Sequence, residues 1–174
     1  MQANGISLAG KENRAARSSE RGVALVETVL IATFILIPLV IGAIDFGRGY
    51  YVAIEVANAA RTAVQYGAQN GATLIDTTNM IAVAKSEAPD VQSACGAGVN
   101  ACWRAGFPTA AYGCECSNQT TFAGGTNNVT SCSCPGSHSV NYVKVTTQVT
   151  YTPLLNLFGP ITLNSQAKMR YGLQ

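Results

Sequence analysis

Six cysteines are the residues whose type and spacing most directly indicate chemistry. They follow the pattern C-x6-C-x11-C-x-C-x15-C-x-C, and they are Cys95, Cys102, Cys114, Cys116, Cys132 and Cys134. Thiols at this density form disulfides in an oxidising compartment, and four thiolates could instead hold zinc or copper(I). Structural zinc sites more often use C-x2–4-C spacing. Three disulfides are therefore the favoured interpretation, and a four-thiolate metal site is the alternative.

The segment around these cysteines, residues 90–139, is rich in Gly, Ser, Thr and Asn and poor in aliphatic residues. It can bury little apolar surface, so covalent links would supply the missing stability. If a C-x-C segment lay on a strand, the side chains of its two cysteines would point to the same face of the sheet. A hairpin between the two pairs predicts Cys114–Cys134 and Cys116–Cys132, which leaves Cys95 for Cys102, one of the fifteen connectivities that six cysteines allow.

Catalysis finds little support in the sequence. His138 is the single histidine, in the polar stretch PGSHSVN, and no nucleophile elbow accompanies it. The glycines near residues 96–98 and 124–125 lack the strand, helix and lysine of a phosphate-binding loop. The sequence therefore predicts a protein that is not an enzyme and that has no cofactor and no metal.

Glu27 is the only charged residue in the apolar run 23–44 of a chain in which only 11% of residues are charged. The 22 residues of this run, at about 1.5 Å each, can cross a hydrocarbon core of roughly 30 Å. An ionisable residue costs roughly 2.5–3.5 kcal/mol at the middle of such a helix, so Glu27 needs a partner. Cleavage between Gly22 and Val23 would create one. Glu27 would then be the fifth residue, one helical turn from a new α-amino group of its own or a neighbouring subunit.

Basic residues predict the orientation of this span. Lys11, Arg14, Arg17 and Arg21 precede it, whereas Arg48 is the only basic residue close after it. The positive-inside rule keeps residues 1–22 in the cytoplasm and exports the cysteines. A secretory signal would have a shorter apolar core followed by a small-residue cleavage site, and the sequence has neither. Without residues 1–22 the chain has seven basic and seven acidic residues, so no nucleic-acid partner is predicted.

A basic leader, Gly22, Val23, Glu27 and a continuous apolar helix resemble the N-terminus of a type IV pilin-like protein. The continuation AIDFGRGYYVAIEVANAARTAVQYGAQ resembles the TadE/TadG-like family, the pseudopilins of the tight-adherence, or Flp, pilus system. The positions that carry this resemblance are Asp45, Phe46, Gly47, Arg48, Ala59, Ala60, Arg61, Ala63 and Gly67. Thr28 departs from the pattern, because an aromatic residue usually follows the glutamate.

The resemblance implies a structural subunit of a pilus used in adhesion or secretion. Its partners would be prepilin peptidase, other pilin-like subunits, the pilus assembly platform and membrane lipid, and it would form a homo-oligomer or filament. It would lie in the bacterial cytoplasmic membrane with its C-terminal domain outside, or in an extracellular pilus. The alternative is an uncleaved single-pass membrane protein whose disulfide-bonded outer domain binds a ligand or surface.

The pattern becomes amphipathic beyond the apolar run, over residues 45–69. Apolar positions recur at helical spacing, while polar residues occupy the remaining surface. The apolar positions are Val52, Val56, Ala59, Ala63 and Tyr66, and the polar ones are Glu55, Asn58, Arg61, Thr62 and Gln65. Small residues allow close helix packing. Gly42, Ala43, Gly47, Ala53, Ala57 and Ala60 could therefore face a bundle of neighbouring helices or cover the protein's own sheet.

The remaining chain, residues 70–174, predicts an exported α+β domain. A short helix is expected over 77–87, capped by Asp76 or Thr77 and closed by Pro89. Alternation of apolar and polar residues predicts two C-terminal strands within 140–172, joined by the apolar loop LLNLFGP. Packed as an antiparallel pair against the long helix, they would give a pilin-like α+β fold. The loop would pack in the core, or touch the membrane or a partner subunit.

Overall fold

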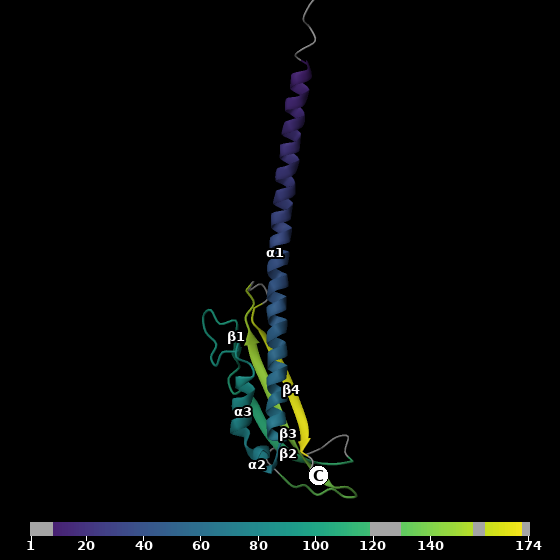
Figure 1. The fold of residues 1–174 in the computed structure, drawn as a ribbon, viewed down its shortest axis with the longest axis vertical. Helices are drawn as coiled ribbons and strands as arrows, with labels where there is room; N and C mark the ends of the chain where they lie inside the picture. Colours follow the sequence, from purple (N-terminus) through teal and green to yellow (C-terminus); the bar gives the residue numbers. More distant parts are fainter. Residues whose placement is uncertain (1–8, 119–129, 155–158, 172–174) are drawn as a thin grey trace, which may run out of the picture. The chain divides into compact units, whose positions relative to one another are not determined.

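The computed structural model describes residues 9–118, 130–154 and 159–171, with side chains from Gly22 onward. The first element is one long helix, α1 (Ala9–Gly67), which contains Pro38 (Figure 1). The chain forms two compact units, Met1–Ile44 and Asp45–Gln174. The apolar loop expected between the C-terminal strands falls largely on residues 155–158, which lie outside the described residues.

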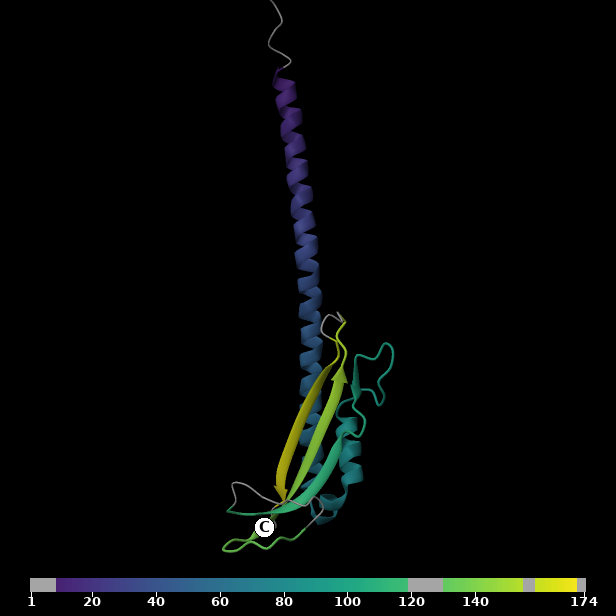
Figure 2. The ribbon, with the colours of Figure 1, turned by 180° about the vertical axis from the view of Figure 1, so that it is seen from behind.

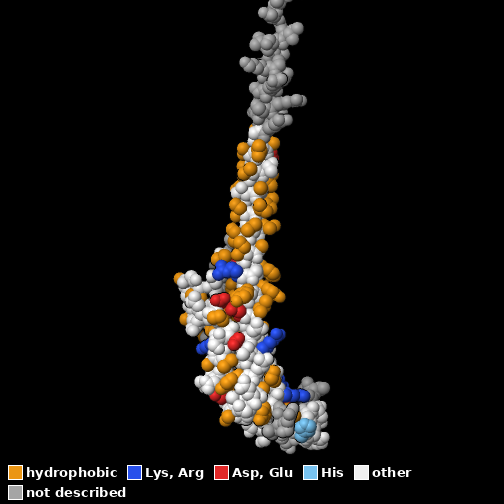
Figure 3. All heavy atoms as spheres, in the orientation of Figure 1, with side chains coloured by type: hydrophobic (Ala, Val, Ile, Leu, Met, Phe, Trp, Pro, Cys, Tyr) orange, Lys and Arg blue, Asp and Glu red, His pale blue; other side chains and the backbone are white. Residues whose placement is uncertain are grey.

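The first unit presents its apolar side chains outward. Leu25, Phe34 and Leu39 are each more than 60% exposed, and hydrophobic side chains cover the visible face of this helix (Figure 3). A helix with exposed apolar residues on all sides needs an apolar environment. Within the described part of the chain, α1 is the one helix long and apolar enough to cross a membrane.

The second unit contains the rest of α1, two short helices and an antiparallel sheet. In chain order these elements are α2 (Gly71–Ile75), α3 (Thr77–Ser86), β1 (Ala101–Trp103), β2 (Thr109–Cys116), β3 (Ser139–Tyr151) and β4 (Ile161–Tyr171). β3 is central, because β4 pairs along one edge while β2 and β1 share the other (Figures 1 and 2). The predicted α+β fold and the antiparallel C-terminal pair are confirmed. β1, and the pairing of β2 with β3, were not predicted.

Side-chain caps define the two short helices. Asn70 Oδ1 accepts hydrogen bonds from the backbone N of Ala72 and of Thr73, both at 2.9 Å. Asp76 caps α3 by accepting from the backbone N of Asn79 at 3.0 Å. That backbone hydrogen bond, helped by the Asn79 side chain, lowers the pKa of Asp76. The helix expected over 77–87 is therefore confirmed, with Asp76 as its cap.

The core lies where α1 covers β3. Ala59 and Ala63 are fully buried, as are Val143 and Val145 on the strand. At Gly67 an added Cβ would lie 2.9 Å from Cγ1 of Val143, closer than real Cβ contacts, so a side chain there would force the helix and strand apart. Small residues on α1 therefore set how closely it approaches the sheet.

A buried hydroxyl also joins this helix to the sheet. Thr147 is fully buried on β3, and its Oγ1 lies 3.1 Å from the carbonyl oxygens of Val56 and of Ser165. The hydroxyl donates to one of these oxygens at a time, which satisfies a polar group that would otherwise be costly to bury.

The structure distinguishes the two uses expected for the small residues. Ala60 is buried within the protein's own second unit, and Ala53 and Ala57 are half-buried, whereas Gly42, Ala43 and Gly47 are exposed. Ala53, Ala57 and Ala60 are thus covered wholly or in part by the second unit, whereas Gly47 is not.

Glu55, expected on the polar surface of the helix, is instead only 8% exposed. The prediction is wrong at this position. The sequence pattern does not show that Asp90, which follows α3, comes close enough to Glu55 for their charges to interact.

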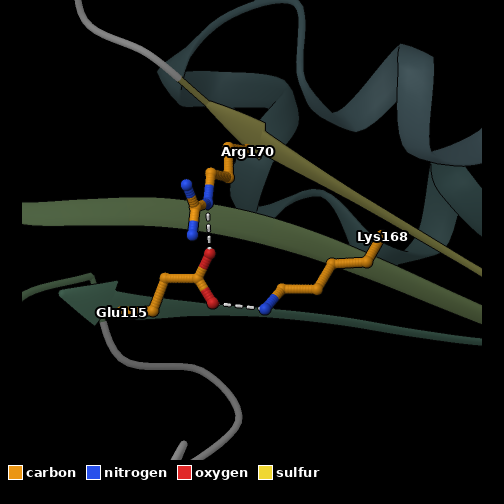
Figure 4. A network of polar contacts seen from close by, with 3 residues as sticks. All are labelled: Glu115, Lys168 and Arg170. Carbon is orange, nitrogen blue, oxygen red and sulfur yellow. Dashed lines mark hydrogen bonds and ion pairs between the residues drawn. The ribbon is translucent and has the colours of Figure 1, made fainter. Parts of the chain in front are cut away.

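An ion-pair network ties the three main strands together on the sheet face opposite the core. Glu115 on β2 is 5% exposed, and its carboxylate accepts from Nζ of Lys168 and, at 2.5 Å, from Nε of Arg170, both on β4 (Figure 4). These bonds cross β3, and Nζ of Lys168 lies 4.2 Å from the centre of the Tyr142 ring on that strand. Burial opposes the charged form of Glu115, but the two cations outweigh it and lower the pKa of the carboxyl.

All six cysteines form disulfides, and one of the three predicted pairs is confirmed. Cys95 pairs with Cys102, with their Cα atoms 5.2 Å apart. The other two predicted pairs are wrong, because the structure has Cys114–Cys132 and Cys116–Cys134, with Cα separations of 5.9 and 5.5 Å.

The expected hairpin between the two C-x-C segments does not form. β2 pairs with β3, so that Cys114 lies opposite Asn141 and Cys116 opposite Ser139, while residues 131–134 are irregular. Cys114–Cys132 and Cys116–Cys134 both have a sequence separation of 18, so the two C-x-C segments meet in the same order rather than in the reversed order of a hairpin.

Replacement of one cysteine tests this pairing. Cys114→Ser should release the thiol of Cys132, because Cys132 is its partner. We expect alkylation under non-reducing conditions, followed by peptide mass spectrometry, to label Cys132. Cys116→Ser is the matched control and should label Cys134. Labelling of Cys134 in the Cys114→Ser variant would instead support the hairpin pairing.

Candidate processing and assembly site

Gly22 and Val23 lie inside α1, which runs from Ala9 into the apolar run without a break. Val23 is 65% exposed, and a Cβ added at Gly22 would meet no atom within 4 Å. Glu27 is also exposed and lies four residues after Val23, about 6 Å along the helix axis. A new amino group on Val23 would therefore lie on the same helix face as the carboxylate.

The surface around Glu27 is apolar. Leu30, Ile31 and Phe34 follow it at helical spacing on one side of α1, and each is more than 50% exposed. Thr28, the departure from the family pattern, satisfies its hydroxyl within the helix by donating from Oγ1 to the carbonyl oxygen of Ala24 at 2.8 Å. Thr28 therefore adds no unpaired polar group to this apolar surface, and Glu27 is the one ionisable side chain on it.

Asp45, the first residue after the apolar run, joins two segments that are distant in sequence. Its carboxylate Oδ1 accepts from the hydroxyl of Tyr151 at 2.8 Å and from the backbone N of Leu154 at 3.1 Å. Asp45 is only 8% exposed, so these bonds stabilise a carboxylate removed from water. They hold the end of β3 against the first turn of α1 in the second unit.

The sequence predicts Tyr151 as the last apolar position of the alternating strand that Pro153 ends, but it does not indicate that Tyr151 bonds to Asp45. Its side chain is 3% exposed, and a Cβ added at Gly49 would lie 3.3 Å from the ring. Burial, followed by the hydrogen bond to Asp45 and the charge of Asp45, raises the pKa of Tyr151 to about 12. The neutral phenol is therefore the form that the fold stabilises.

The other predicted motif residues divide between the surface and the core. Phe46 is 77% exposed, and Gly47 and Arg48 are exposed beside it. Ala60 is buried and Arg61 is exposed on the next part of the helix. The motif thus combines packing positions with side chains that remain free to meet another surface.

A buried glutamate, Glu55, lies on the part of α1 that belongs to the second unit, and the sequence pattern did not indicate its burial. Burial, followed by the charge of Asp90, raises the pKa of Glu55, and the charges of Glu55 and Asp90 raise the pKa of Tyr51. The Tyr51 side chain hydrogen-bonds to Glu55, while Oε2 of Glu55 has no partner among the described residues. Among all the residues that the structure describes, no group of three or more His, Cys, Asp or Glu side chains is arranged to hold a metal ion.

The comparison with known families bears on the first half of the chain. Residues 22–65 match the TadE-like protein family. The resemblance to TadE-like proteins is thereby confirmed for the segment that contains Glu27, Asp45 and Arg61. The TadE-like match begins at Gly22 and ends just before Gly67, so it covers the apolar run and the helix that packs on the sheet. No curated protein and no solved structure matches the chain.

Loss of the Tyr151 hydroxyl tests its bond to Asp45. Tyr151→Phe should lower the free energy of unfolding of the second unit by about 1–2 kcal/mol at pH 7, because a buried carboxylate loses a donor. Unfolding by urea in detergent can be followed through Trp103, the single tryptophan, which is 5% exposed. Tyr171→Phe, at the other end of the sheet, is the matched control.

The contribution of Tyr151 to the free energy of unfolding should also depend on pH. A pKa raised from 10.0 to about 12 stabilises the native protein fully below pH 10, and this contribution is lost as the pH rises toward 12. Phenylalanine has no such contribution to lose. The stability difference between the native protein and Tyr151→Phe should therefore shrink above pH 10, and a constant difference would contradict the assignment.

Proposed function

We propose that this chain is a pilin-like subunit of a tight-adherence-type pilus, cleaved after Gly22 by prepilin peptidase and assembled through Glu27. The observation that carries the proposal is the TadE-like match, which starts at Gly22 and includes Glu27 on an otherwise uncharged apolar helix. Membrane anchoring by α1 is consistent with its length and hydropathy.

The charge pairing gives Glu27 its role in assembly. After cleavage, the helix would begin at Val23 with a positive amino group, and an acid in the first turn complements the helix dipole. A carboxylate on an apolar surface is stabilised by pairing with a cation. The amino group of a neighbouring subunit can supply that cation, so helices would be drawn into one register along a filament.

The second unit would present the disulfide-bonded segment outside the membrane. Its fold buries Ala59, Ala60 and Ala63, and it places Ala59 and Ala63 in the core shared with the sheet, so these residues are not free for contacts between subunits. Exposed apolar residues on α1, including Tyr50 and Ile54, remain for such contacts. Assembly would therefore use the span and the outer side of the helix rather than the core of the exported unit.

Cleavage is tested by substitution of the glycine that precedes the bond. Co-expressed with prepilin peptidase, the native chain should lose residues 1–22 and begin at Val23, as measured by intact mass and N-terminal sequence. Gly22→Val should retain the leader, because a branched side chain replaces the small residue at the cleaved bond. Gly42→Val is the matched control, since an added Cβ meets nothing within 4 Å at either glycine. An uncleaved native chain would favour an anchored binding protein.

The role of Glu27 is tested separately from cleavage. Glu27→Ala should insert in the membrane and be cleaved, yet its incorporation into pili sheared from a host with the assembly system should fall about tenfold or more, the effect of losing roughly 1.4 kcal/mol of pairing. Thr28→Ala is the neighbouring control, because that hydroxyl bonds only within its own helix. Equal incorporation of both variants would remove Glu27 from the proposal.

A further inference from the structure

The connection from β3 to β4 is tied to the point where the chain leaves the apolar run. The backbone N of Leu154 lies 3.1 Å from Oδ1 of Asp45, and Asp45 directly follows Ile44. If residues 23–44 span the membrane, chain connectivity places Asp45 at its surface. Leu154 is then also at that surface, because one hydrogen bond joins the two residues.

The side chains gathered at this end are apolar and exposed. Phe46 is 77%, Leu154 53% and Ile161 43% exposed. Ile161 belongs to the same end of the sheet, because it pairs with Tyr151, the residue that bonds Asp45. Arg48 is exposed about one turn of helix beyond Asp45. It is close enough to Tyr151 for its positive charge to lower the pKa of that phenol.

This combination of side chains fits the boundary layer of a bilayer. Headgroups add roughly 5–7 Å on each side of the hydrocarbon core, and Phe46 lies only about 3 Å beyond Ile44 along the helix. Aromatic and aliphatic side chains bury their apolar parts at this depth, while an arginine reaches phosphate oxygens with its guanidinium. In water, the same side chains would leave apolar surface exposed.

We propose that Phe46, Leu154 and Ile161, together with Arg48, form a lipid-contacting patch that seats the exported unit on the phospholipid headgroup layer. The patch would contact the outer surface of the membrane that α1 crosses. We favour lipid over other partners because the patch directly follows the membrane span in the chain. The proposal rests on the membrane span of the proposed function, but not on cleavage at Gly22 or on assembly through Glu27.

Tryptophan fluorescence in vesicles tests the patch. The full chain is reconstituted in phosphatidylcholine and phosphatidylglycerol vesicles that contain lipids with a nitroxide near the glycerol end of the acyl chain. We expect the emission added by Leu154→Trp to fall about twofold, the effect of insertion to the headgroup–acyl boundary. The native chain supplies the background, because Trp103 is buried and common to all variants.

Ile75→Trp is the matched control within the second unit. Ile75 is 54% exposed, like Leu154, but it ends α2 at the opposite end of the sheet, where Gly71 approaches Tyr171. The 11 residues of β4 separate the two ends by roughly 35 Å. Emission from Ile75→Trp should therefore be insensitive to the nitroxide. Equal quenching of both variants, or of neither, would overturn the patch.

Two further variants control for the membrane span and for misfolding. Phe34→Trp, in the span, should be quenched by lipids with a nitroxide near the bilayer centre, and its failure would reject the span itself rather than the patch alone. If Leu154→Trp loses the shielded emission of Trp103, it has not folded, and Ile161→Trp places the probe at the same end. If the new tryptophan at position 154 or 161 is shielded from water yet is not quenched by the nitroxide lipids, the patch contacts another protein chain rather than lipid. That result would overturn the proposal.

Discussion

Close approach of α1 to β3 is the constraint on which the second unit depends. Ala59, Ala63 and Gly67 leave room for the strand, and the hydroxyl of Thr147 reaches helix and sheet carbonyls from between them. β3 in turn pairs with every other strand of the sheet. A larger residue on this side of the helix would therefore displace the whole sheet, not one contact.

One helix has to satisfy two environments, and its sequence changes where they meet. From Val23 to Ile44 most side chains are apolar and exposed, which suits lipid, and from Asp45 onward the helix belongs to the second unit. Asp45 makes that change possible because its carboxylate is placed where a phenol and a backbone N can bind it. The same residue thus ends the apolar run and fixes the start of the folded unit.

Structural elements that arise from a local sequence pattern could be predicted from the sequence. The apolar run, the cap at Asp76 and the alternation over Val143 and Val145 each reflect interactions within a few residues, and the structure contains all three. Contacts between distant segments were not predictable in this way.

The misses have one physical origin, which is tertiary pairing. The pairing of Cys114 depends on which strand β2 joins, and nothing near that cysteine indicates that the partner is β3 rather than residues 131–134. The charge that acts on Glu55 comes from Asp90, 35 residues later in the chain. Likewise, Asp45 could be recognised as part of a motif, but its partner Tyr151 is 106 residues away.

The bond between Asp45 and Tyr151 also determines how a mechanical load would enter the second unit. Tension transmitted along the chain from the apolar run would arrive first at Asp45, where it would divide between the α1 backbone and the end of β3. The helix is thereby protected from being peeled off the sheet one turn at a time, since its first turn is already fastened to the central strand. Rupture would require helix and strand to slide past each other together, with Thr147 and the small residues of α1 resisting along the whole contact.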